Sequence, residues 1–272
     1  MVRKMRGGAQ AHLIEASDGN HYVVKFQNNP QHRRILINEW ISATFLSYLG
    51  VSTPPVAMIR IKEDFLDANP DVYMQLGSQR FSPAVGWHFG SRFPGDPTRM
   101  AVYDFLPDAL LGKVENLPEF AGVLAFDKWS GNADARQAIF FRARLKERNA
   151  RGPIVPPPVG FIGQMMDNGY VFEGPNWRLT ESPVQGLYFR PLVYRSIRGW
   201  ADFEPWLERI RHFPEEVVDQ ALKEIPSAWM AEDREILERL LERLLVRRKR
   251  VPDLIEECRK ARSDPFPDWR AK

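Results

Sequence analysis

The residues that decide the fold are Asn132-Ala133-Asp134-Ala135-Arg136-Gln137 and, further along the chain, Asp167-Asn168-Gly169. The first group follows an apolar segment of helical spacing, from about Leu117 to Ser130, and precedes a short strand-like run. The second group follows another strand-like run, which begins at Val159. Acidic and amide side chains on loops between regular elements are typical of functional sites, because a rigid framework positions them. These two polar turns are therefore the centre of the predicted site.

The chain before the first polar turn is predicted to be rich in strands and to contain one long helix. Ala11 to Glu15 and His21 to Phe26 have strand composition, and the turn sequence Ser17-Asp18-Gly19-Asn20 between them predicts a hairpin. A helix is predicted from about Arg33 to Leu49, where apolar residues recur at helical spacing, and Gly50 is a suitable residue to end it.

The remaining segments predict a change from strands to helices along the chain. Asp64 to Thr98 is rich in glycine, serine, proline and aromatic residues, which predicts an irregular insertion with some strand in it. Met100 to Phe105 is predicted to be a buried strand, and Glu147 to Pro158 a turn region. The stretch from about 200 to 262 is predicted to be mostly helical.

The change from strands to helices comes near residue 107, and this order predicts the fold class. It is the order of an α+β, protein-kinase-like, two-lobed fold with a β-rich first lobe that contains one helix. We expect residues 1–106 to form this N-terminal lobe and residues 107–272 to form a mostly helical C-terminal lobe. A chain of 272 residues is long enough to bury a core of this size.

Composition and charge exclude several classes of protein. The net charge of +3 is too small to indicate nucleic-acid binding, so we expect no nucleic-acid partner. No apolar run is long enough to span a bilayer, and no apolar segment follows the basic N-terminus, so we expect neither a membrane partner nor a signal peptide. Cys258 is the single cysteine and has no partner for an internal disulfide, which favours a reducing, cytoplasmic location.

Phosphoryl transfer from ATP needs a small set of groups, and the N-terminal half of the chain offers candidates for three of them. Gly7 and Gly8 precede the first predicted strand, where backbone amides can approach phosphate groups closely. Lys25 lies in an otherwise apolar strand and is a candidate phosphate ligand. Glu39, on the predicted helix, is a candidate partner for that lysine. A solvent-facing lysine and a surface glutamate are the simpler interpretations.

The predicted C-terminal lobe offers the remaining groups. Asp134 lies on a loop between a helix and a strand, where kinases place the catalytic aspartate. Asp167 begins a turn similar to the metal-binding Asp-Phe-Gly of kinases, although Asp-Asn-Gly is also a common turn sequence. Gln137 can offer an amide oxygen to a metal ion. Together these residues predict a site for ATP and Mg²⁺.

Five segments of the chain resemble HipA-like kinases, in particular their compact, stand-alone bacterial members. The segments are Arg6-Gly7-Gly8-Ala9-Gln10, Tyr22-Val23-Val24-Lys25-Phe26, Asn38-Glu39-Trp40, Phe126 to Asp134 and Met166 to Phe172. The resemblance covers most of the chain. It implies that Lys25 binds ATP phosphates, that Asp134 is the catalytic aspartate and that Asp167 holds magnesium.

The same resemblance implies where the adenine sits and which partners to expect. The adenine would lie against the segment from Tyr103 to Pro107, which makes Asp104 and Phe105 candidate nucleotide-binding residues. The implied acceptor is a protein hydroxyl, on a substrate that the sequence does not identify. A DNA-binding, antitoxin-like protein is the implied partner.

The catalytic loop and the activity each have alternative interpretations. The usual catalytic loop has an asparagine five residues after the aspartate, but that position here is Ile139, and Gln137 is its candidate replacement in a shortened loop. Asp127 and Asn132 are also five residues apart, although Asp127 falls in the apolar helical pattern. The alternative functions are a nucleotide-binding pseudokinase or regulatory module, a small-molecule or lipid kinase, and a nucleotidyl transferase.

Overall fold

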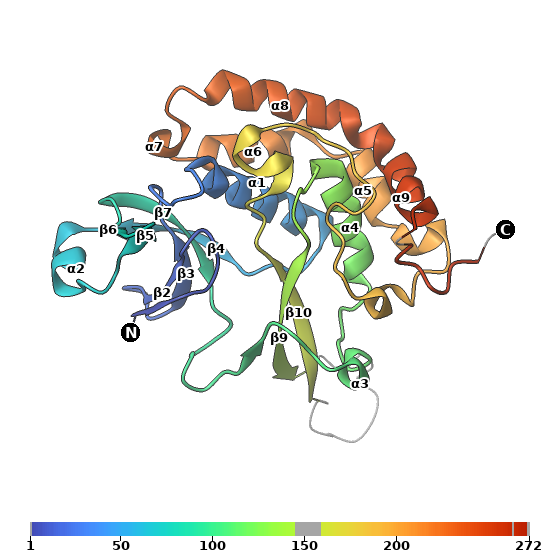
Figure 1. Cartoon of the computed structure of the whole chain (residues 1–272). Helices are drawn as coiled ribbons and strands as arrows, with labels where there is room; N and C mark the ends of the chain where they lie inside the picture. Colours follow the sequence, from blue (N-terminus) through green and yellow to red (C-terminus); the bar gives the residue numbers. More distant parts are fainter. Residues whose placement is uncertain (1, 145–158, 263, 271–272) are drawn as a thin grey trace.

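The protein is described by a computed structural model that covers residues 2–144, 159–262 and 264–270. Figure 1 shows a strand-rich N-terminal part on one side and a helical C-terminal part on the other. This division confirms the predicted change from strands to helices. The boundary between residues 106 and 107 stays a prediction, and the predicted turn region from Glu147 to Pro158 lies outside the described residues.

The N-terminal part is built on an antiparallel sheet of five strands in the order β1-β2-β3-β7-β4. Its strands are β1 (Val2–Lys4), β2 (His12–Glu15), β3 (His21–Lys25), β4 (Val56–Ile61) and β7 (Gly86–Arg92). The predicted hairpin is confirmed as β2 and β3. Its turn places Gly19 at a φ of 77°, a left-handed conformation that glycine adopts without strain.

Strand β7 is the main difference between this sheet and the prediction. The sequence predicts an irregular insertion with some strand in it from Asp64 to Thr98, and the structure shows that this segment supplies a strand of the main sheet, between β3 and β4. A Cβ atom at Gly90 would lie 2.5 Å from the Cγ1 atom of Ile59 on the neighbouring strand, so this glycine allows the two strands to approach. The same glycine interrupts the strand composition, which is why the sequence pattern concealed β7.

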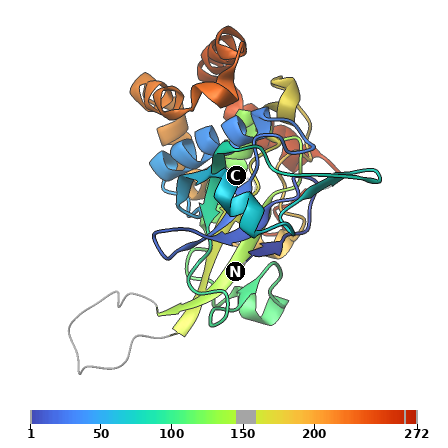
Figure 2. The same ribbon diagram turned by 90° about the vertical axis from the view of Figure 1, so that its left-hand side faces the viewer.

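The rest of that segment forms small elements at the edge of the sheet. They are α2 (Glu63–Ala68), β5 (Met74–Leu76) and β6 (Gln79–Phe81), the last two paired as a separate hairpin. Figure 2 shows this hairpin projecting from the body of the molecule.

Helix α1 (Arg34–Leu49) joins the two parts of the molecule. It ends at Gly50, which has a φ of 72°, as predicted from the sequence. The ring of Phe45 stacks on Trp129 at 5.7 Å and lies 4.7 Å from Phe213, so the helix shares a hydrophobic core with the C-terminal part. The sheet has its own smaller core around Phe26. Helix α1 is therefore held by the core of the C-terminal part, while its sequence belongs to the N-terminal part.

The predicted buried strand from Met100 to Phe105 is wrong. Only Val102–Tyr103 form a strand, β8, which pairs with two residues of β9, and the side chain of Phe105 is 57% exposed. The longer pair is β9 (Gln137–Arg144) with β10 (Val159–Met166), which runs away from the helices in Figure 2. This pair carries the two polar turns at one of its ends, because Gln137 lies opposite Met166.

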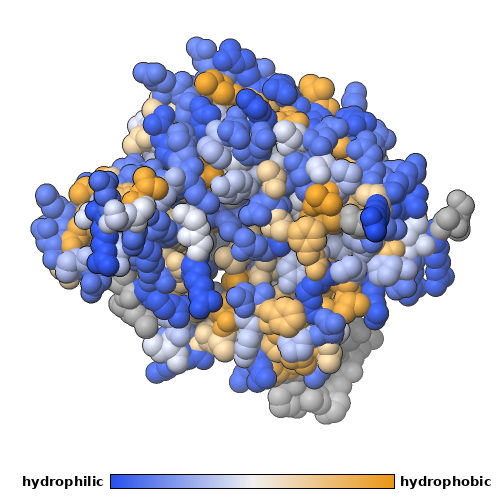
Figure 3. All heavy atoms as spheres, in the orientation of Figure 1, coloured by the Kyte–Doolittle hydropathy of each residue, from blue (hydrophilic) through white to orange (hydrophobic). Residues whose placement is uncertain are grey.

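The C-terminal part consists of helices around α4 (Glu119–Ser130), which is buried along almost its whole length. The other helices and short 3-10 turns are α3 (Asp108–Leu111), η1 (Val171–Asn176), η2 (Pro191–Tyr194), η3 (Trp200–Phe203), α5 (Trp206–Arg211), α6 (Glu215–Glu224), α7 (Ser227–Met230), α8 (Arg234–Arg247), η4 (Arg248–Arg250) and α9 (Val251–Lys260). Among the described residues, no helix has both the length and the apolar character needed to cross a bilayer. The face shown in Figure 3 is mostly hydrophilic.

Candidate active site

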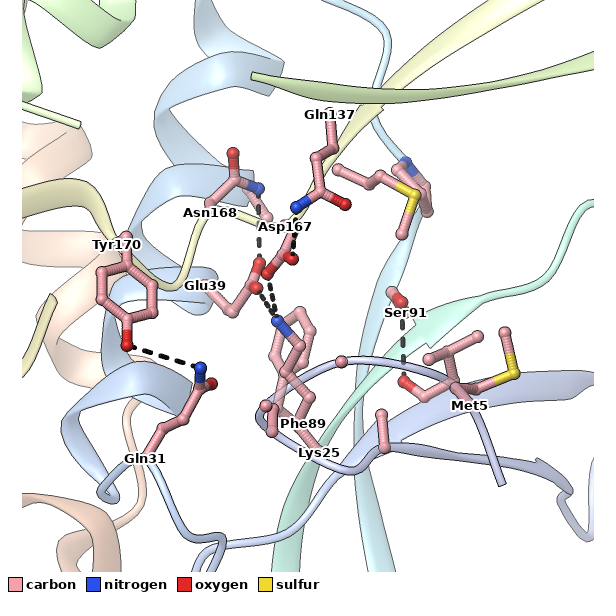
Figure 4. A pocket seen from close by; sticks show the side chains of 18 of the residues that line it. Met5, Lys25, Gln31, Glu39, Phe89, Ser91, Gln137, Asp167, Asn168 and Tyr170 are labelled. Carbon is pink, nitrogen blue, oxygen red and sulfur yellow. Dashed lines mark hydrogen bonds and ion pairs between the residues drawn. The ribbon is translucent and has the colours of Figure 1, made fainter. Parts of the chain in front are cut away.

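Lys25, Glu39 and Asp167 form an ionic cluster where the sheet, α1 and β10 meet. The Nζ atom of Lys25 makes an ion pair with Oε1 of Glu39 and lies 2.7 Å from Oδ1 of Asp167. Figure 4 shows the three side chains pointing toward one another. Their exposed fractions are 12% for Lys25, 4% for Glu39 and 35% for Asp167, so the cluster is buried at Glu39 and open at Asp167. The sequence predicted the pair of Lys25 with Glu39, and the structure brings these residues together.

The charges of this cluster stabilise one another. Burial by itself lowers the pKa of Lys25, but the ion pairs with Glu39 and Asp167 outweigh burial and raise that pKa above its ordinary value. The charge of Lys25 in turn lowers the pKa of the Asp167 carboxyl group. One lysine between two carboxylates leaves a net charge of −1, and the exposed carboxylate is the one at the open side. Such a cluster suits a cation at that side.

Asp167 is also held by the polar residues around it. Nε2 of Gln137 donates to Oδ2 of Asp167 at 3.1 Å, so the two candidate metal ligands are in contact. Asn168 donates from Nδ2 to Oε2 of Glu39 at 3.3 Å and accepts at Oδ1 from Nη1 of Arg136 at 2.8 Å. Asp167 itself has a φ of 60°, a left-handed conformation that aspartate tolerates better than most residues.

A second ionic cluster lies behind the first and is fully buried. Arg136 and Asp127 have no exposed surface, and Arg136 donates to both carboxylate oxygens of Asp127, with a distance of 2.9 Å from Nε to Oδ2. Burial lowers the pKa of Arg136, but the charge of Asp127 outweighs that effect and raises it. Arg136 also donates to the carbonyl oxygen of Met166 at 2.9 Å. It therefore holds both residues that flank Asp167, namely Met166 and Asn168.

The buried cluster also shapes the loop that carries Asp134. Nδ2 of Asn132 donates to Oδ1 of Asp127 at 3.0 Å, and Oδ1 of Asn132 accepts from the backbone N–H of Asp134 at 3.1 Å. The side chains of Asp127 and Asn132 are buried and do not line the cavity described next, whereas Asp134 is exposed and does line it. This placement favours Asp134 over Asp127 as the candidate catalytic aspartate.

A cavity of about 250 Å³ connects these side chains. Its lining includes Lys25, Glu39, Asp134, Gln137 and Asp167, together with the loop that contains Gly7 and Gly8. Gly7 has a φ of 119°, and within the described part of the chain no atom beyond its chain neighbours lies within 4 Å of the position that a Cβ would take, so the loop is both glycine-dependent and open there. Apolar side chains, among them Val23 and Phe89, line the part of the cavity under the sheet.

Asp104 and Phe105 are the two candidate site residues that the structure does not bring to this cavity. Neither residue lines it. The ring of Phe105 lies instead under the guanidinium group of Arg190, 4.4 Å from its Cζ atom. Residues 103–105, at and after the short strand β8, are exposed at the surface. The role of Asp104 and Phe105 in nucleotide binding stays a prediction that this geometry does not favour.

Three polar residues of the site were not predicted as functional from the sequence. Arg136 and Asn168 were noted only as members of the two polar turns, and Asn38 only as a neighbour of Glu39. Each is buried. A polar residue inside an otherwise apolar pattern indicates a buried polar group, and buried polar groups need hydrogen-bond partners. Which partners they have depends on contacts between residues far apart in the chain.

Comparison of the sequence with protein families identifies a family match. The model of a family described as HipA-like kinase matches residues 1–139. This range is just over half of the 272-residue chain and contains Lys25, Glu39, Asp134 and Gln137. A search of curated proteins found no match.

Comparison with solved structures finds similar folds at low sequence identity. The structure of hydra Fam20 with sugar is 14% identical, with a TM-score of 0.52, over 95% of this chain and 84% of that one. The Golgi casein kinase with Mn/ADP bound is 12% identical, with a TM-score of 0.48, over 96% of this chain and 73% of that one. The similarity to hydra Fam20, the match to the HipA-like kinase family and the strand-rich and helical parts together confirm the predicted α+β, protein-kinase-like fold class.

Proposed function

The chain belongs to the HipA-like kinase family and is a phosphotransferase of the kinase type, and from this premise we propose that it is an ATP- and Mg²⁺-dependent Ser/Thr protein kinase. The observation that carries the proposal is the meeting of Lys25, Glu39 and Asp167 at one cavity that also contains Asp134 and Gln137. These five residues come from four separate segments of the chain, since Asp134 and Gln137 share one turn, and phosphoryl transfer requires such groups together.

The residues at the open side of the cavity suit a hard cation with a bound nucleotide. Asp167 and Gln137 offer carboxylate and amide oxygen atoms, which Mg²⁺ prefers. Among the residues that the structure describes, no group of three or more histidine, cysteine, aspartate or glutamate side chains gathers to hold a metal. Mg²⁺ is commonly bound by one or two carboxylates together with the phosphates of the substrate, so this donor set fits it. When bound, the ion neutralises charge on the phosphates and polarises the transferred group.

The protein residues have distinct roles in this proposal. Lys25, fixed by Glu39, holds the phosphates of ATP, and the loop around Gly7 covers them with backbone amides. Asp134 orients the acceptor hydroxyl group and accepts its proton as the oxygen of that hydroxyl bonds to the γ-phosphorus. The bond from the γ-phosphorus to the bridging oxygen breaks at the same time, and ADP leaves. Placement of the reacting groups and stabilisation of charge account for most of the rate enhancement in such reactions.

The acceptor, the partner and the location complete the proposal. We propose a protein hydroxyl as acceptor, on the basis of the family, and a DNA-binding, antitoxin-like protein as partner, with no nucleic acid and no membrane lipid bound directly. The single cysteine, Cys258, is buried, which supports a reducing, cytoplasmic location.

Labelling with γ-³²P-ATP and Mg²⁺ tests the proposal. The wild-type protein should label itself or a protein substrate, and Asp134→Ala should abolish labelling, because the acceptor hydroxyl loses the group that orients it. Asp219→Ala is the matched control, since Asp219 is an exposed aspartate on α6 outside the cavity, and it should label like the wild type. Labelling that survives Asp134→Ala would contradict the assignment.

Further measurements with ATP on the same protein separate the alternative functions. Stabilisation of the protein by ATP without any turnover would identify a nucleotide-binding pseudokinase or regulatory module. Transfer of the label only to small molecules or lipids would identify a kinase with a different acceptor. Transfer of label from α-³²P-ATP to protein would identify a nucleotidyl transferase.

A further inference from the structure

Asn38 connects α1 to the segment that follows Asp167, and neither the proposed mechanism nor the family match assigns it a role. It has no exposed surface and precedes Glu39 in the helix. Its Nδ2 atom donates to the carbonyl oxygens of Gly169 at 2.7 Å, Gly174 at 3.0 Å and Val171 at 3.2 Å. Its Oδ1 atom accepts from Nε1 of Trp177 at 2.8 Å. One side-chain amide therefore binds four residues of a segment more than 130 positions away in the chain.

The segment that Asn38 holds is conformationally strained. Phe172 and Glu173 have φ values of 56° and 57°, and Trp177 has a φ of 54°. Asp167, just before the segment, also has a positive φ. Non-glycine residues keep such conformations only where the surrounding structure imposes them. Buried carbonyl groups in this irregular backbone also need donors, and the amide of Asn38 provides them.

A second residue on the same face of α1 binds the same segment. Arg34 lies one turn before Asn38, donates from Nη1 to the carbonyl oxygen of Pro175 at 2.8 Å and stacks over the ring of Trp177 at 4.3 Å. Arg34 also makes an ion pair with Asp233, just before α8. Helix α1 therefore contacts the segment after Asp167 along two turns, while its Glu39 holds Lys25 and Asn168.

We infer that Asn38 is a positioning residue for the metal-binding Asp167: it fixes the strained backbone after that aspartate to the helix that fixes Lys25. The phosphate-binding and metal-binding halves of the site then move as one unit. This inference rests on the proposed function for its kinetic consequences. Its structural consequence, a backbone held by Asn38, is independent of any bound nucleotide.

The kinetic test is the Mg²⁺ dependence of ATP labelling in Asn38→Asp. This variant keeps an acceptor for Trp177 but loses the donors to the three carbonyl groups. The Mg²⁺ concentration for half-maximal labelling should rise roughly tenfold or more, because unsatisfied carbonyl groups release the segment. The ATP concentration for half-maximal labelling at saturating Mg²⁺ should change less than about threefold, since Lys25 keeps Glu39. An unchanged Mg²⁺ dependence would overturn the inference.

Three further variants separate positioning from a loss of stability. Trp177→Phe keeps the ring beneath Arg34 but removes the N–H that orients the Asn38 amide, so it should shift the Mg²⁺ dependence in the same direction by a smaller factor. Ser42 lies one turn after Asn38, and its buried Oγ atom has no hydrogen-bond partner among the described residues, so Ser42→Ala should leave the Mg²⁺ dependence unchanged. Leu244→Ala destabilises the buried core at α8 and should lower the melting temperature without that shift.

Hydrogen exchange of the protein without nucleotide or metal tests the same inference even if the proposed kinase activity fails. In Asn38→Asp, the amides of Val171 and Gly174 should exchange at least roughly tenfold faster than in the wild type. The amides in the middle of α1 should keep their rates. Equal exchange of the 169–177 segment in both proteins would overturn the inference. If wild-type protein shows no Mg²⁺-dependent labelling but this exchange difference is seen, the proposed function fails while the role of Asn38 in holding the segment stands.

Discussion

The two ionic clusters of the site are made of similar side chains but are built for different tasks. In the buried cluster, Asp127 and Arg136 have no exposed surface, and one carboxylate faces one guanidinium group. In the open cluster, Lys25 lies between Glu39 and Asp167, and Asp167 is 35% exposed at the cavity. The first cluster is neutral and closed. The second carries an extra negative charge where a cation can reach it.

This difference shows how the fold separates stability from binding. A buried pair of opposite charges keeps its geometry, because separating the two would leave an uncompensated charge in the protein interior at a high cost in free energy. Arg136 uses this rigidity to hold the residues on both sides of Asp167. The open cluster has two carboxylates that share one lysine, and its extra negative charge lies at the partly exposed Asp167. The closed pair thus positions the open one.

The largest expected effect comes from making the same substitution in each cluster. Asp127→Asn should lower the free energy of unfolding by about 3–5 kcal/mol, because it leaves the charge of Arg136 buried without compensation. Asp167→Asn should lower it by about 1 kcal/mol or less, because Lys25 keeps Glu39 and the site is partly solvated. Denaturant-induced unfolding measures both values. Equal losses of unfolding free energy in the two variants would show that the buried cluster contributes no more to stability than the open one.

For labelling activity we expect the opposite order, with the larger loss from the substitution in the open cluster. Asp167→Asn should reduce ATP-dependent labelling more than about a hundredfold, because a metal bound at the phosphates supplies several kcal/mol of transition-state stabilisation. The variant should keep the melting temperature close to that of the wild type. Initial rates of labelling at saturating ATP and Mg²⁺ provide the measurement. A variant with nearly full activity would remove Asp167 from the proposed metal site.

The smallest expected effect is the response of the open cluster to acid. Lys25 lowers the pKa of the Asp167 carboxyl group in the folded protein below its ordinary value of about 4. The resulting stabilisation is therefore fully present above about pH 4 and is lost as the pH falls through the lowered pKa.

The unfolding free energies of the wild type and Asp167→Asn should consequently converge as the pH falls from about 4 through the lowered pKa, by less than about 1 kcal/mol because the carboxylate is partly exposed. Denaturant unfolding at several pH values measures this difference. A difference that stays constant over the range would contradict the assigned ion pair.

Much of the fold and several parts of the site were predictable from local patterns. The hairpin of β2 and β3, helix α1 and the helical C-terminal part follow from turn residues and apolar periodicity. Some strand was predicted between Asp64 and Thr98, but the place of β7 was not, because Gly90 gives this strand an unusual composition. A Cβ atom at Gly90 would lie only 2.5 Å from Cγ1 of Ile59. Strand β8 was predicted too long and too buried, because an apolar run does not show whether neighbouring elements cover it.

The sequence by itself determined which chemical groups the protein has and on which elements they lie. Lys25 on a strand, Glu39 on a helix and acidic residues in two turns are local facts, set by residue type and spacing. Only the tertiary structure decided which groups meet. It joined Lys25 to Asp167, buried Asp127 with Arg136 and placed Asn38 against the segment after Asp167. The physical reason is that Lys25 with Asp167 and Asn38 with its partners are far apart in the chain, so these contacts form only when the whole core packs. Asp127 and Arg136 are only nine residues apart, but their burial also depends on the packed core around them.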